Sequence, residues 1–160
     1  MNSARQLCLG IGLLLGTSLA TAKEVTIQVQ MVSYEGEKTY SALYLVNPSG
    51  RYEQTLWVSG DEEKYYADGL SRWWKYLSRQ PEPQPLDGLT GATIGSGDRY
   101  QVTSELDERF IDSGYALRVE TAVEDREYYR LDAEVPLASQ YHRKKVDGHG
   151  WVRYLRFNWQ

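Results

Sequence analysis

The sequence predicts a mainly β protein, an antiparallel β-sandwich of immunoglobulin or fibronectin type with about seven strands and one inserted amphipathic helix. Three observations support this class. Short segments alternate between apolar and polar residues, turn residues separate them at regular spacing, and one segment changes to helical periodicity. The aromatic content agrees with this class: 13 tyrosines and 5 tryptophans against 2 phenylalanines suit half-buried strands whose side chains keep a polar tip in water.

The first 22 residues have the pattern of a secretory signal peptide. A basic start at Arg5 is followed by an apolar run over residues 7–16 and by the small-x-small sequence Ala20-Thr21-Ala22. The run is short for a membrane span, so we expect cleavage after Ala22 and a periplasmic mature chain without a transmembrane segment. Cys8 is the only cysteine, so the mature chain has no disulfide and no thiol chemistry.

The mature chain, residues 23–160, is long enough to bury one hydrophobic core, and we expect a single domain. The full sequence has 18 lysines and arginines against 22 aspartates and glutamates, a formal net charge of −4. This balance argues against nucleic acid or an anionic membrane surface as the main partner.

Three strands are predicted before the helix. Residues 24–33 alternate between apolar and polar, and residues 40–46 repeat the behaviour. The turn sequence Asn47-Pro48-Ser49-Gly50 then leads into a returning strand over residues 53–58. We expect these three strands to form an antiparallel meander.

Helical spacing replaces the alternation over about residues 62–79. The apolar positions are Tyr66, Leu70, Trp73, Trp74 and Leu77. Gly69 weakens this helix by about 1 kcal/mol relative to alanine, which allows a break or kink there. Pro81 ends the helix, and a stiff proline-rich linker over residues 80–86 leads to a loop at 87–97.

After this loop the alternation resumes and predicts the remaining strands, at 99–105, 115–123, 128–135 and 151–159. The two middle strands are joined by Glu124-Asp125-Arg126, and we expect them to form a hairpin.

Conventional catalytic groups are scarce. His142 and His149 are the only histidines, and together with Asp147 they lie in a loop whose basic run at 143–145 repels a cation. No serine lies in a recognisable nucleophile elbow. We therefore predict neither a metal site nor a hydrolase, and we do not expect a stand-alone enzyme.

The loop Asp87-Gly88-Leu89-Thr90-Gly91-Ala92-Thr93 has residue types that suit a cofactor. Its small and hydroxyl-bearing residues are Gly88, Thr90, Gly91, Ala92 and Thr93. Glycines permit positive φ and the close approach of a bulky group, and backbone amides in such a turn can form a nest for phosphate oxygens. A loop of this composition is also common as a plain turn, so the residue types leave both interpretations open.

This loop resembles the flavinylation motif Asp-x-x-Ser/Thr-Gly-Ala-Thr of FMN-carrying subunits in sodium-pumping quinone reductases and related electron-transfer complexes. In those proteins a flavin transferase uses FAD to attach FMN through a phosphoester to the last threonine. The resemblance therefore implies covalent FMN on Thr93 and a role for Asp87 in recognition or magnesium placement during attachment.

Aromatic residues elsewhere in the chain are candidates to lie against the flavin ring. We consider Trp73, Trp74 and Tyr100 for this role, because flat rings stack on aromatic faces. Neighbouring tryptophans at helical positions, however, more often pack in a core.

The mature chain as a whole resembles the DUF2271 family of predicted periplasmic proteins. The resemblance rests on the strand pairs, on Leu70-Ser71-Arg72-Trp73-Trp74, on the loop at 87–93 and on the strand at 113–120. Members often accompany membrane proteins of PepSY type and flavin-handling partners. This implies a periplasmic redox accessory or electron-transfer protein whose partners are a flavin transferase and a PepSY-type or other membrane redox protein.

A second interpretation has no flavin. The chain would then be a binding or assembly module that docks a membrane partner through a sandwich face or an edge strand.

Overall fold

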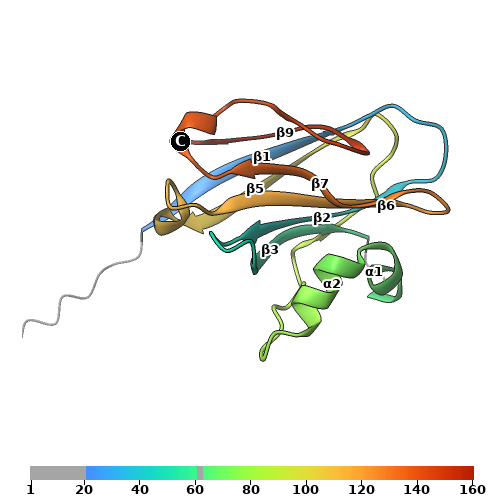
Figure 1. The fold of residues 1–160 in the computed structure, drawn as a ribbon, viewed down its shortest axis with the longest axis horizontal. Helices are drawn as coiled ribbons and strands as arrows, with labels where there is room; N and C mark the ends of the chain where they lie inside the picture. Colours follow the sequence, from blue (N-terminus) through green and yellow to red (C-terminus); the bar gives the residue numbers. More distant parts are fainter. Residues whose placement is uncertain (1–20, 61–62) are drawn as a thin grey trace, which may run out of the picture.

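The computed structural model describes residues 21–60 and 63–160. Within them, nine strands form two stacked sheets, and a helical layer covers one sheet (Figure 1). The elements are β1 (Ala22–Met31), β2 (Thr39–Val46), β3 (Tyr52–Ser59), α1 (Glu63–Gly69), α2 (Ser71–Ser78), β4 (Thr90–Gly91), β5 (Arg99–Asp107), η1 (Glu108–Phe110), β6 (Ala116–Val123), β7 (Tyr128–Pro136), η2 (Ser139–Tyr141), β8 (Val146–Asp147) and β9 (Val152–Trp159). Most of the predicted signal peptide, residues 1–20, lies outside this part of the chain.

The strands form sheet A, in the order β5-β1-β9-β8, and sheet B, in the order β4-β3-β2-β6-β7. Every strand pair is antiparallel except the parallel pair of β3 and β4. The predicted β-sandwich is confirmed, and so is the hairpin of β6 and β7. Of the predicted meander, the antiparallel pair of β2 and β3 is confirmed, but the place of β1 is wrong, because β1 pairs with β5 and β9 in the other sheet.

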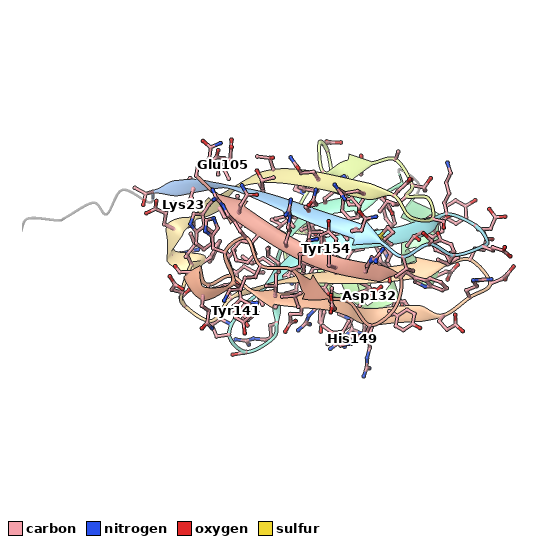
Figure 2. The ribbon with its side chains drawn as sticks, turned by 90° about the horizontal axis from the view of Figure 1, so that it is seen from above. Lys23, Glu105, Asp132, Tyr141, His149 and Tyr154 are labelled. Carbon is pink, nitrogen blue, oxygen red and sulfur yellow. The ribbon has the colours of Figure 1, made fainter. Side chains whose placement is uncertain are left out.

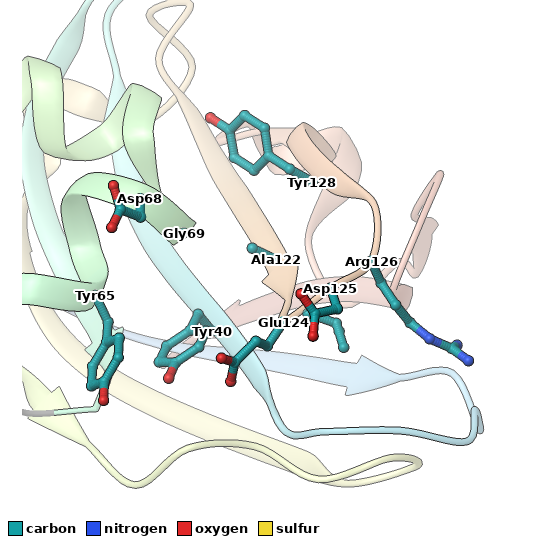
Figure 3. Close-up of a pocket in the computed structure, with 10 residues that line it drawn as sticks. Tyr40, Tyr65, Asp68, Gly69, Ala122, Glu124, Asp125, Arg126 and Tyr128 are labelled. Carbon is teal, nitrogen blue, oxygen red and sulfur yellow. The ribbon is translucent and has the colours of Figure 1, made fainter.

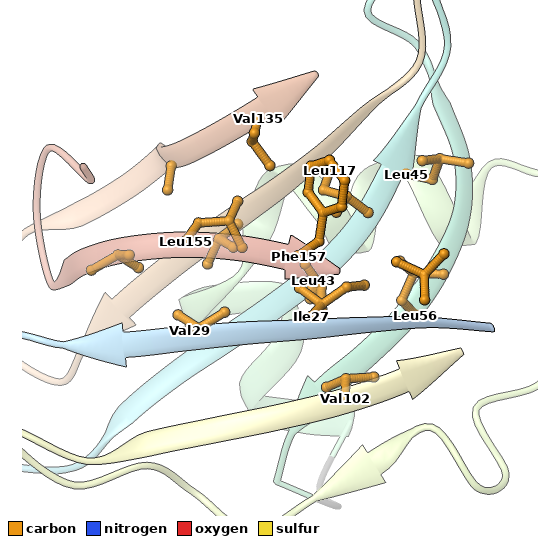
Figure 4. Packing of buried hydrophobic residues seen from close by; sticks show 14 of the residues in the cluster. Ile27, Val29, Leu43, Leu45, Leu56, Val102, Leu117, Val135, Leu155 and Phe157 are labelled. Atoms are coloured by element: carbon orange, nitrogen blue, oxygen red, sulfur yellow. The ribbon is translucent and has the colours of Figure 1, made fainter. Parts of the chain in front are cut away.

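One hydrophobic core fills the space between the sheets. Figure 4 shows Ile27 and Val29 of sheet A packed among Leu43, Leu45 and Leu117 of sheet B. All five side chains are completely buried. Side chains alternate along a strand, so the odd-numbered residues of β2 face this core and its even-numbered residues face the opposite side of sheet B.

Helices α1 and α2 cover that opposite side, where a second apolar cluster forms (Figure 1). The cluster comprises Ala42, Tyr44, Val46, Val58, Tyr66, Leu70, Trp73, Leu77 and Ala116. The single helix predicted over residues 62–79 is two helices. Leu70 between them has φ −116° and ψ 50°, directly after Gly69, where the sequence allows a break.

A buried carboxylate fastens the loop that precedes β9. Asp132 of β7 is completely buried and lies beside His149 (Figure 2). It accepts hydrogen bonds of 2.8–3.1 Å from the backbone N–H groups of the four consecutive residues 149–152. Asp132 therefore holds a polar loop against the hydrophobic sandwich.

Candidate functional site

The loop that the sequence singles out begins with a tight turn. The N–H of Leu89 donates to the carbonyl of Leu86 at 2.9 Å and closes the turn. Gly88 occupies its third position with φ +76°, in the left-handed region that favours glycine. Asp87 and Gly88 are both exposed. Gly88 thus reverses the chain so that the following residues run beside β3.

Residues Thr90–Gly91 form β4, a short parallel strand at the edge of sheet B. The N–H of Val58 donates to the carbonyl of Leu89 at 2.9 Å, and the N–H of Gly60 donates to the carbonyl of Gly91 at 2.6 Å. These bonds hold the centre of the loop at a defined position on the sheet.

Gly91 is required by packing at this edge. A Cβ atom at Gly91 would lie 2.6 Å from Nε1 of Trp57, closer than real Cβ contacts allow. The Trp57 ring in turn stacks on Tyr100, with ring centroids 4.5 Å apart. Gly91 therefore has a structural role that does not depend on a cofactor.

Thr93 faces the helical side of sheet B. The next residue, Ile94, forms an isolated antiparallel bridge with Thr39, whose N–H donates to the Ile94 carbonyl at 2.8 Å. Both bridge residues are buried toward the core, with exposed fractions of 0% and 4%, so their neighbours Tyr40 and Thr93 point to the opposite face. Thr93 is half-buried, and its hydroxyl has no hydrogen-bond partner among the described residues.

An open depression of about 400 Å³ lies beside this part of the loop. It is lined by Gly60, Thr90, Gly91, Ala92 and Thr93. Thr90 and Ala92 are exposed, and Gly60 and Gly91 line the depression with backbone atoms only. The depression and the exposed neighbours leave room for a phosphoester-linked group at Thr93.

None of the three predicted ring-stacking residues lines this depression. Trp73 is a residue of α2 and is completely buried, and its Nε1–H donates to Thr55 Oγ1 at 2.9 Å. Trp74 is half-buried in the helical layer. Tyr100 stacks on Trp57 and faces the core between the sheets, where burial raises the pKa of its phenol. Trp73 and Tyr100 thus have structural roles in these positions.

Two tyrosines that the sequence does not single out lie near Thr93 instead. The position of a Cβ atom on Gly60 would be 3.9 Å from Thr93 Cγ2 and 4.0 Å from Tyr40 Cε1. Tyr40 stacks on Tyr65 of α1, with centroids 5.8 Å apart and planes inclined by 27°. The available sequence signal is weak: Tyr65 is an aromatic residue off the buried stripe of its helix.

The loop that contains the two histidines packs on aromatic rings. The ring of His142 stacks on that of Trp159 with centroids 4.7 Å apart, and the ammonium group of Lys145 lies over the ring of Tyr154. The described residues contain no group of three side chains suited to hold a metal ion. No helix in residues 21–60 and 63–160 is long and apolar enough to cross a membrane.

Comparison with known proteins identifies one family. Residues 22–154 match the family described as "Predicted periplasmic protein (DUF2271)". No curated protein and no solved structure has significant similarity to the chain.

Proposed function

Because this chain belongs to the DUF2271 family of predicted periplasmic proteins, we propose that it is a periplasmic redox accessory protein that carries FMN covalently on Thr93. One observation carries the proposal. The threonine at the last position of the flavinylation-like motif lies in an open depression at a sheet edge, and its hydroxyl has no partner within the described residues. A threonine in this position is accessible to a modifying enzyme without unfolding of the core.

The attachment is a phosphoryl transfer to the side chain. Thr93 Oγ1 forms a bond to the phosphorus on the FMN side of the FAD pyrophosphate, the phosphoanhydride bond breaks, AMP leaves, and the hydroxyl proton is lost. Thr90 and the backbone of Gly91 line the depression where the new phosphate would lie. The exposed Asp87 carboxylate remains available to the transferase or to its magnesium ion.

Bound FMN supplies electron transfer, and the protein supplies its position and surroundings. The bonds between β3 and β4 hold the attachment loop on a rigid sheet, which favours a fixed position over a freely tethered one. We propose a flavin transferase as the partner that loads the protein and a PepSY-type or other membrane redox protein as the partner that exchanges electrons with it.

The test is co-expression of the exported protein with a periplasmic flavin transferase, followed by intact-mass measurement and in-gel flavin fluorescence. We expect a mass increase equal to one FMN phosphoester, lost in Thr93→Ala and retained in the matched control Thr103→Ala, an exposed threonine of β5 outside the loop. An unmodified wild-type mass in the presence of an active transferase refutes covalent loading. Retained FMN in Thr93→Ala places the attachment elsewhere.

The second candidate function, a binding module without flavin, is supported by strand β7. This strand is an edge of sheet B, and Leu131 and Tyr128 on it are 41% and 38% exposed. Exposed apolar side chains on an edge strand suit the addition of a strand from another protein. An unmodified mass in the experiment above, together with membrane association that Leu131→Lys abolishes, would favour this function.

A further inference from the structure

A groove between α1 and sheet B opens next to the attachment threonine. It has a volume of about 340 Å³, and Figure 3 shows Tyr65 of α1 and Tyr40 of β2 side by side along it. Gly69 and Ala122 also line it, and Tyr128 forms another part of its lining. The groove therefore presents aromatic faces and has little side-chain bulk at Gly69 and Ala122.

The exposure of these rings is unusual for this protein. Among the described residues, the large hydrophobic side chains that stand out as exposed are Tyr65 at 40%, Tyr128 at 38% and Leu131 at 41%. Two of these three line the same groove. Exposed aromatic residues gathered in one hollow indicate a binding surface more than chance exposure does.

The groove and Thr93 are connected through the strand geometry. Tyr40 and Thr93 follow and precede the paired residues Thr39 and Ile94, so they are cross-strand neighbours on one face of the sheet. Both come close to Gly60, which has φ +83° and no side chain to separate them. A group attached to Thr93 thus begins close to Tyr40.

We propose that the Tyr40–Tyr65 groove holds the isoalloxazine ring of FMN attached to Thr93, an inference that rests on the proposed function. The ribityl chain leads from the phosphate past Gly60 to the groove. Tyrosine rings offer flat, electron-rich faces on which a planar ring system stacks. The aromatic partners of the flavin are then Tyr40 and Tyr65, and not Trp73, Trp74 or Tyr100.

The test uses the exported protein, loaded with FMN by co-expression. Its readout is flavin fluorescence, because tyrosines stacked on the flavin ring quench this emission. Intact mass first establishes loading. Emission per bound FMN is then compared with that of free FMN in the same buffer. We expect wild-type emission to be severalfold below that of free FMN, and Tyr65→Leu to recover most of the difference. Tyr115→Leu, at the opposite end of β6, is the matched control and should leave the quenching unchanged.

A second variant guards against misfolding of Tyr65→Leu. Gly69→Ala adds a methyl group 3.7 Å from Tyr40 Cδ2 and 3.9 Å from the Ala122 Cβ, which are ordinary contacts, so the fold is retained. The added methyl narrows the groove, and we expect it to increase emission. A loaded protein that emits like free FMN, or whose emission neither variant changes, overturns the groove assignment while leaving attachment to Thr93 intact. An unloaded wild type instead refutes the proposed function.

Discussion

Replacing Glu120 tests how the helical layer is held on the sandwich. Glu120 lies in the middle of β6, is completely buried, and faces the start of α2. The N–H of Trp73 donates to its two carboxylate oxygens at 3.0 and 3.2 Å, and the N–H of Arg72 donates at 3.2 Å. The hydroxyl of Tyr128 donates at 2.8 Å. Since no side chain of α2 itself caps this helix, Glu120 serves as its N-terminal cap from the sheet.

The expected loss in the free energy of unfolding follows from these hydrogen bonds. In Glu120→Ala the buried N–H of Trp73 loses its partner, which costs about 1–3 kcal/mol, and the lost cap adds about 1 kcal/mol. Removal of a buried charge offsets part of this cost, so we expect a net loss of about 1–3 kcal/mol. Glu120→Gln keeps one oxygen acceptor and should cost about 1 kcal/mol at neutral pH.

The pH dependence has a definite sign. Burial raises the pKa of Glu120 above its ordinary value of 4.5, against the opposing effect of its hydrogen bonds. The folded protein therefore binds this proton more tightly than the unfolded chain does. The resulting stabilisation is complete below the ordinary pKa and is lost as the pH rises through the raised value. The stability of the wild type relative to Glu120→Gln should fall over this interval.

Urea unfolding followed by tryptophan fluorescence measures these differences at about pH 3.5 and about pH 7, roughly one unit below and well above the ordinary pKa of glutamate. Glu82→Ala and Glu82→Gln in the exposed linker are matched controls with the same change in charge. A loss in Glu120→Ala of less than about 0.5 kcal/mol relative to the control, the range of surface substitutions, would refute the capping role.

Three further predictions concern other parts of the chain. Gly91→Ala should lower the free energy of unfolding by about 1–3 kcal/mol, because its Cβ would collide with Trp57, and urea unfolding would measure this. Asp132→Ala should cost about 3–5 kcal/mol in the same assay, since it leaves the buried or half-buried amides of Gly150, Trp151 and Val152 without their acceptor. In FMN-loaded protein, Asp68→Asn combined with Glu124→Gln should raise the flavin midpoint potential, because these two carboxylates line the proposed ring site and oppose the negative charge that reduction adds. The increase should be larger at low salt, and spectroelectrochemical titration would measure it.

Local patterns in the sequence predict most of the elements but not their partners. Alternation identifies the seven long strands, and the short connection that follows residue 123 identifies the hairpin of β6 and β7. The placement of β1 was not predictable in the same way. Its partners β5 and β9 are distant in the sequence, and an alternating strand packs equally well beside any neighbour that shares its buried face. The two-residue strands β4 and β8 are too short to have a period at all.

In the candidate site too, local features can be predicted from the sequence, and contacts between distant residues cannot. The turn at Gly88 follows from residue type, because a glycine at the third position of a turn accepts positive φ. The role of Gly91 could not be predicted, since it depends on contact with Trp57 on another strand. The meeting of Tyr40 with Tyr65 depends on how α1 lies across β2, and the periodicity of either segment contains no information about that packing.

The break after Gly69 and the burial of Glu120 explain each other. In one continuous helix, the N–H groups of Arg72 and Trp73 would donate to carbonyls four residues earlier, and Glu120 would be buried without these donors. With the break at Leu70, the same amides turn to the carboxylate instead. A helix-weakening glycine and a charged residue inside a buried strand are each unfavourable alone, yet together they satisfy both sets of polar groups. The pair also anchors the helical layer over sheet B, where α1 brings Tyr65 against Tyr40 near the loop at 87–93.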